Sequence, residues 1–150
     1  MKRIVIYLLV LGAALAFPAD GMDIGKLQPV GLVQLYMVEE KVVIRTDTGD
    51  LGVGNSAHAA FENLEDTTPG VIFLDTADFL LVSASAKGEL DALSEYLKPS
   101  VRVCIGEEDI EPVQAAEYLA MHRPSTRLKE FDETSQGQKL LQENGRLHLQ

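Results

Sequence analysis

The chain has little cysteine, no tryptophan and no cluster of basic residues. Its 150 residues contain one cysteine, Cys104. A lone cysteine cannot form an internal disulfide. Cys104 lies in the apolar stretch VRVCIG, beside Val103 and Ile105, and no activating partner is near it in the sequence. We therefore expect a buried thiol that packs as a small apolar side chain, and not a nucleophile.

Positive charge is scarce as well. The chain has 13 Lys and Arg against 23 Asp and Glu, a net charge of −10. Proteins that bind nucleic acid release counterions through clustered Lys and Arg, and no such cluster occurs here. We therefore exclude DNA and RNA as partners. The acidity favours solubility and weakens attraction to anionic lipid surfaces. With 46% apolar residues, the chain is long enough for one compact domain with a core.

The N-terminus has the three parts of an export signal. Lys2 and Arg3 are positive, residues 4–17 are an uninterrupted apolar run, and Ala14-Leu15-Ala16 is an A-x-A cleavage pattern. The run is shorter than the ~20 residues that a spanning helix needs. We predict that residues 1–19 are a signal peptide or membrane anchor, and that a retained segment 4–17 would hold the protein at a membrane. Without a cysteine in residues 17–22, no lipid can be attached there.

Hydrophobic periodicity in the remaining chain predicts an α/β (α+β) fold, a mixed sheet of about five strands packed with three helices. Asn55 or Ser56 is suited to cap the first helix, and the run Thr68-Pro69-Gly70 is suited to end it. Pro112 fits the first turn of the last helix. The expected strands are 29–38, 41–46, 71–75, 79–84 and 101–106, and the expected helices are 57–67, 86–98 and 108–122. We expect the first two strands to form an antiparallel hairpin, although the turn between them lacks the Asn-Gly signal.

The pattern weakens after residue 122. Residues 123–150 are polar and of mixed charge, so we expect a loosely ordered tail with at most a short helix near 136–144. The predicted organisation is thus a signal or anchor (1–19), a single α/β domain (20–122) and a polar C-terminal tail (123–150).

Two Asp-Thr motifs raise the question of an aspartic protease. Asp47 lies in TDTGD and Asp75 in LDTAD, each after an apolar run. Such proteases need two carboxylates that share a proton. Arg45 precedes the first motif and Ala77 replaces the required glycine in the second, so each motif has half of the pattern. We interpret both as turns in which Asp and Thr side chains bind backbone N–H groups.

No other motif indicates catalysis, a cofactor or a metal. The stretch GDLGVGN has the wrong glycine spacing for a phosphate-binding loop, and no serine lies in a G-x-S-x-G setting. His58, His122 and His148 are far apart in the sequence. The stretches DTGD and EEDIE could be considered for calcium, but neither has the alternating aspartates of a calcium-binding loop. We therefore predict no catalytic, cofactor-binding or metal-binding residues.

Residues 23–131 resemble a stand-alone, divergent form of the N-terminal domain of the Ger(x)C spore germination proteins, the C subunits of nutrient germinant receptors. Gly54, Ser56 and Ala60 match the family's G-x-T-x-x-E-A helix start. Ala86 and Gly88 match its G-E-E-L-A segment loosely, and Arg102 matches the end of R-D-x-E-x-R. The family's lipobox cysteine and most of the glutamates in its motifs are absent. The resemblance implies a spore-forming Gram-positive source and a role without catalysis at the outer face of a membrane.

The expected function is therefore that of an exported, extracytoplasmic, non-enzymatic domain that contacts a protein partner at the membrane outer face. The resemblance makes germinant receptor subunits the candidate partners, in sporulation or germination. The candidate contact surfaces are the loop 49–54 and acidic helix faces that carry Glu62, Glu65, Asp66, Glu89 and Glu95. Two alternatives stay open: a small extracytoplasmic enzyme, or a ligand-binding domain, that uses the loops at Asp47 and Asp75.

Overall fold

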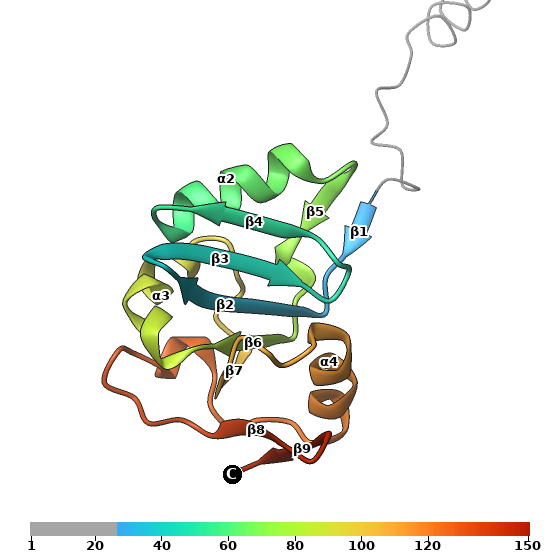
Figure 1. Cartoon of the computed structure of the whole chain (residues 1–150), viewed down its shortest axis with the longest axis vertical. Helices are drawn as coiled ribbons and strands as arrows, with labels where there is room; N and C mark the ends of the chain where they lie inside the picture. Colours follow the sequence, from blue (N-terminus) through green and yellow to red (C-terminus); the bar gives the residue numbers. More distant parts are fainter. Residues whose placement is uncertain (1–26) are drawn as a thin grey trace, which may run out of the picture.

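The computed structural model describes residues 27–150 (Figure 1). The predicted signal or anchor at residues 1–19, with its apolar run 4–17, lies outside these residues. Within the described part, strands and helices alternate as expected, and the mixed α/β class is confirmed.

The main sheet has seven strands in residues 27–150, not the five that we expected. Its order is β4-β3-β2-β6-β7-β8-β9, which Figure 1 shows from β4, beside α2, to the C-terminal pair. Strands β2, β6, β7 and β8 are parallel, and β3, β4 and β9 are antiparallel to their neighbours. The strands are β2 (Leu32–Val38), β3 (Lys41–Thr46), β4 (Leu51–Gly54), β6 (Phe79–Val82), β7 (Arg102–Gly106), β8 (Lys139–Glu143) and β9 (Arg146–Leu149). A separate parallel pair joins β1 (Leu27–Pro29) to β5 (Val71–Phe73).

The first and last helices follow their sequence signals. Helix α2 (Ala57–Thr67) starts at the cap Ser56, whose hydroxyl accepts a hydrogen bond from the Ala59 N–H at 3.2 Å. Helix α4 (Pro112–Met121) begins at Pro112, where the missing N–H would have no partner in the helix anyway. The start of α2 was predicted, whereas α4 begins four residues later than the predicted residue 108, with Pro112 in its first turn as expected.

The middle helix is much shorter than expected. Residues 86–98 were predicted as one helix, whereas the chain forms the 3₁₀ helix η3 (Ala84–Glu89) and the single-turn helix α3 (Leu90–Leu93). Gly88 weakens helix formation in this segment. The apolar spacing was read correctly nonetheless, because Leu90, Leu93 and Leu97 are all buried.

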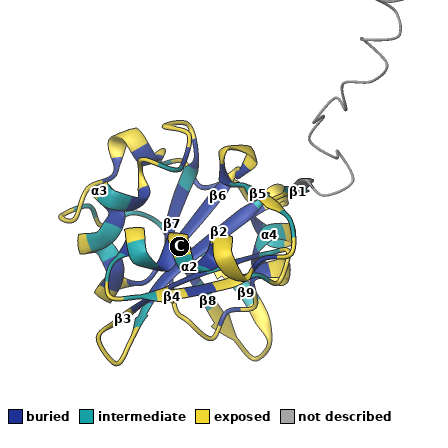
Figure 2. Ribbon diagram, turned by 90° about the horizontal axis from the view of Figure 1, so that it is seen from above, coloured by how far each residue is buried: buried dark blue, intermediate teal, exposed yellow. Residues whose placement is uncertain are grey.

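Helices cover the two faces of the sheet unequally. Helices α2 and α3 pack on the face that carries alternate residues of the central strands, such as Leu35, Ile44 and Val103. Helix α4 packs on the opposite face, against Leu81 and Cys104. Figure 2 shows the buried strands running between exposed outer elements. The result is a three-layer arrangement in which the central parallel strands β2, β6 and β7 are buried on both faces.

The C-terminal region is a structural part of the sheet. The prediction of a loosely ordered tail with a short helix near 136–144 was wrong, because β8 and β9 extend the main sheet. Leu140 of β8 is fully buried in the core on the α4 side. The hairpin turns at Asn144 and Gly145, both with positive φ. Asn-Gly is the residue pair that favours such a turn, and it is the local signal that we overlooked.

The prediction of a loop at residues 49–54 was also partly wrong, because residues 51–54 form strand β4, an outer strand of the sheet. A Cβ at Gly52 or Gly54 would overlap the backbone of α2, so these glycines let the helix lie close against the strand. The Asn63 side chain of α2 accepts a hydrogen bond from the Val53 N–H at 2.9 Å. This contact occupies a backbone group that an edge strand would otherwise leave open to another chain.

Candidate functional site

The loops that connect the parallel strands lie at two opposite edges of the sheet, one at the carboxyl ends of these strands and one at their amino ends. After β6 the chain passes into η3 on the α3 side of the sheet, and after β7 it passes into α4 on the other side. Two neighbouring strand ends whose loops leave to opposite faces open a crevice between them. In open α/β sheets, ligands bind in such a crevice beyond the carboxyl ends of the strands.

A cavity occupies this position. We call it the carboxyl-edge crevice, and its volume is about 620 Å³. This is within the roughly 300–1,000 Å³ of known ligand sites. It is lined by Ser83, Ala84, Ser85, Ile105, Gly106, Glu107, Glu108, Asp109, Lys139, Leu140 and Leu141.

The crevice combines apolar and polar groups. Ile105 and half-buried Leu141 contribute apolar surface, and the hydroxyl groups of Ser83 and Ser85 lie 3.0 Å apart in a hydrogen bond. Gly106 has no side chain because a Cβ there would collide with Leu81 in the core. The lining therefore contains an apolar area next to groups that can form hydrogen bonds.

Buried Gln34 holds one wall of the crevice. Its amide nitrogen donates hydrogen bonds to the carbonyl of Glu107 at 3.1 Å and that of Ile110 at 3.3 Å. Gln34 is 1% exposed, and its Oε1 has no hydrogen-bond partner among the described residues. An amide in the core costs free energy unless it is bonded. The two bonds fix the loop after β7 to strand β2, so this wall is positioned by the core.

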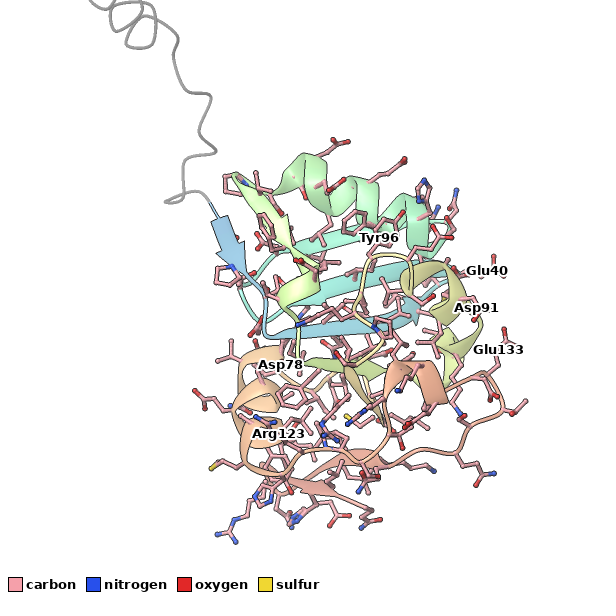
Figure 3. All side chains as sticks on the ribbon, turned by 180° about the vertical axis from the view of Figure 1, so that it is seen from behind. Glu40, Asp78, Asp91, Tyr96, Arg123 and Glu133 are labelled. Carbon is pink, nitrogen blue, oxygen red and sulfur yellow. The ribbon has the colours of Figure 1, made fainter. Side chains whose placement is uncertain are left out.

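Negative charge dominates the crevice. Glu107, Glu108 and Asp109 face a single cation, Lys139, which leaves two net negative charges in the lining. The turn between β2 and β3 lies at the same edge of the sheet and adds Glu39 and Glu40. Figure 3 shows Glu40 on the opposite side of the molecule from Asp78 and Arg123.

The Asp47 loop follows β3 and the Asp75 loop precedes β6, so both lie at the other edge of the sheet. Both carboxylate oxygens of Asp47 accept a hydrogen bond from the Gly31 N–H, at 3.1 and 3.2 Å. Asp75 is exposed in the 3₁₀ helix η2 (Leu74–Thr76). Thr76 bonds to the Val30 backbone. Asp47 therefore stabilises a chain crossing, and its partner is a distant residue rather than the local turn that we expected.

The histidines lie on separate elements. His58 is 3.2 Å from Glu62 on α2. The His122 ring lies tilted against Tyr118 at the end of α4, and His148 is on β9. In residues 27–150, no three His, Cys, Asp or Glu side chains are grouped so that they could hold a metal ion.

Cys104 is 0% exposed in the core under α4, as predicted. Burial disfavours the thiolate and raises the pKa of Cys104 to about 12.

One residue of the acidic helix faces that we predicted as contact surfaces, Glu89, has a structural role. The Glu89 carboxylate accepts a hydrogen bond from the Ala57 N–H at 2.9 Å, at the start of α2. Glu62, Glu65 and Asp66 are exposed on α2. Sequence reasoning missed the carboxyl-edge crevice, and the only local signal for it was a polar run directly after each of two buried strands.

None of the helices in residues 27–150 is long and apolar enough to cross a membrane. No family model, curated protein or solved structure matches the chain, so the resemblance to the Ger(x)C proteins stays a prediction.

Proposed function

We propose that the chain is an exported, non-catalytic α/β domain that binds a partner protein through the carboxyl-edge crevice. The observation that carries this proposal is the crevice itself, which opens where the loops after β6 and β7 leave to opposite faces of the sheet. Export rests on the sequence of residues 1–19. A role in sporulation or germination, with receptor subunits as partners, rests on the family resemblance.

The lining indicates the chemistry of the partner. Two net negative charges beside an apolar area favour a segment that carries Lys or Arg next to an apolar side chain. Gln34 fixes the wall at Glu107, so binding requires little reorganisation of that loop. A preformed site loses less conformational entropy on binding, which favours affinity.

Photo-crosslinking in the source cells tests the proposal. A photo-crosslinking amino acid replaces Ala84, an exposed residue of the crevice lining, in the full chain. We expect one dominant crosslinked protein. Combining this replacement with Glu107→Lys and Glu108→Lys should abolish the adduct, because the charge of the crevice is reversed.

The matched control is Glu62→Lys with Glu65→Lys, which reverses the same number of charges on the exposed face of α2. This control should leave the Ala84 adduct unchanged. An adduct that is lost in the α2 variant but kept in the crevice variant would show that the acidic helix face is the contact surface. The absence of any adduct at residue 84 in cells that express the chain would also contradict the proposal.

A further inference from the structure

A second pocket lies at the opposite edge of the sheet and has the opposite charge. It is lined by Asp78, Phe79, Ser100, Arg102, Arg123 and Arg127, and its volume is about 250 Å³. Arg102, Arg123 and Arg127 are three of the six arginines in a chain of net charge −10. They come from β7, from the segment just after α4 and from the segment before the 3₁₀ helix η4 (Leu128–Glu130). We call this the arginine pocket.

The fold places two of these arginines directly opposite each other. Arg102 and Arg127 form an antiparallel β-bridge. The Val103 N–H donates to the Thr126 carbonyl at 2.9 Å, and the Leu128 N–H donates to the Val101 carbonyl at 2.7 Å. These flanking bonds make Arg102 and Arg127 a non-hydrogen-bonded pair, the register in which opposite side chains are closest. Like charges in that position repel each other and destabilise the fold.

No ion pair among residues 27–150 offsets this repulsion, because no carboxylate there lies within ion-pair distance of any of the three guanidinium groups. The Glu130 carboxylate accepts a hydrogen bond from the backbone N–H of Arg127 at 3.2 Å. Asp78 lines the pocket, and Figure 3 shows it on the same side of the molecule as Arg123. The three arginines and one aspartate leave two net positive charges.

One guanidinium is held in place. Arg102 is half-buried, and its Nη1 donates a hydrogen bond to the Pro124 carbonyl at 2.7 Å. The remaining N–H donors of the Arg102 guanidinium can bind a ligand. Guanidinium groups match the oxygen geometry of phosphate through paired hydrogen bonds. The Ser100 hydroxyl adds a neutral donor to the lining.

We propose that the arginine pocket binds a phosphate group, which belongs to a free or small-molecule phosphate or to a lipid headgroup. A phosphate dianion would neutralise the two net positive charges, relieve the repulsion between Arg102 and Arg127, and fit a small polar pocket with only Phe79 as a large apolar residue. This site goes beyond the proposed function, because it is formed by other residues at the opposite edge of the sheet.

Equilibrium dialysis of the full chain with radiolabelled inorganic phosphate, at constant ionic strength, tests the proposal. We expect saturable binding of one phosphate per chain. Arg123→Gln and Arg127→Gln should each weaken binding at least tenfold. The matched control is Arg146→Gln, an exposed arginine on β9, which should bind phosphate like the unmodified chain.

Thermal unfolding gives a second measurement that does not depend on detecting the ligand. Phosphate should raise the melting temperature of the unmodified chain and of Arg146→Gln, because a ligand stabilises the state that it binds. Arg127→Gln should melt at the same or a higher temperature without phosphate, since the like-charge pair is gone, and should gain little when phosphate is added.

Flotation with vesicles distinguishes the two sources of the phosphate. Binding to vesicles that contain phosphatidic acid, and not to pure phosphatidylcholine vesicles, identifies a lipid headgroup if Arg123→Gln and Arg127→Gln abolish it. Binding of inorganic phosphate without flotation identifies a free or small-molecule phosphate. Neither kind of binding, or binding that Arg146→Gln weakens equally, would overturn the proposal. A phosphate-independent dimer that Arg127→Gln dissociates would also overturn it, because carboxylates of a second copy would then fill the pocket.

Discussion

Single residues in this protein adopt backbone conformations that their side chains do not favour. Strands β2 and β3 are joined by a two-residue turn, because Val38 pairs with Lys41. Both turn residues have positive φ, 46° at Glu39 and 66° at Glu40. This type of turn favours Asn-Gly, since a Cβ in the left-handed region costs roughly 1–2 kcal/mol. The sequence correctly predicted a hairpin here even without that signal, because the two strands carry strong apolar patterns.

The turn can be relieved by mutation. We expect the double variant Glu39→Asn, Glu40→Gly to raise the free energy of unfolding by about 1–2 kcal/mol, measured by urea denaturation. The control is Glu39→Gln, Glu40→Gln, which removes the same charges and leaves a Cβ at both positions. If the control gained as much stability, relief of charge repulsion and not backbone strain would be the cause.

At the scale of elements, close packing depends on residues that look like loop formers in the sequence. Gly52 and Gly54 were assigned to a flexible loop, yet they lie in β4 beneath α2. Glycine signals a turn and a close backbone approach equally well, and only the neighbouring helix decides between them. The cap at Ser56 could be predicted because its partner, the Ala59 N–H, is three residues away.

Alanine substitution distinguishes a glycine that allows close packing from one that only makes the chain flexible. A Cβ at Gly52 would lie well under 3.0 Å from the carbonyl oxygen of Ala60, so α2 would have to move away from β4. We expect Gly52→Ala to lower the free energy of unfolding by about 2–3 kcal/mol. At Gly88, a Cβ would meet only Glu133 Oε1, at 3.7 Å, so Gly88→Ala should leave stability unchanged or slightly raised. Equal losses in the two variants would show that chain flexibility, and not helix packing, explains the glycine at position 52.

At the scale of the whole molecule, the two edges of the sheet carry opposite charge. The carboxyl-edge crevice has two net negative charges and the arginine pocket has two net positive charges, in a chain that is acidic overall. The sequence shows no cluster of basic residues, because Arg102, Arg123 and Arg127 are spread over 26 positions of the chain. The pairing of Arg127 with Arg102, at the start of β7, brings the segment 123–127 to this pocket.

The C-terminal hairpin β8–β9 belongs to the main sheet, and two adjacent leucines test how much it contributes to stability. Leu140 is fully buried under α4, whereas its neighbour Leu141 is half-buried on the other face of the strand. We expect Leu140→Ala to cost about 2–5 kcal/mol in the free energy of unfolding, and Leu141→Ala clearly less. Similar small losses in both variants would mean that the C-terminal strands contribute little to stability, as the sequence first suggested.

The sequence by itself determined the local elements: the β2–β3 hairpin, the capped start of α2, the place of Pro112 in the first turn of α4 and the burial of Cys104. These depend on contacts within a few residues or on an apolar period that repeats along one segment. Only the tertiary structure decided the order of the strands, the inclusion of residues 139–149 in the sheet, and the position of both pockets. The physical reason is that each pocket is formed by loops that are distant in the chain, and what places those loops together is the pairing of strands, which no short stretch of sequence encodes.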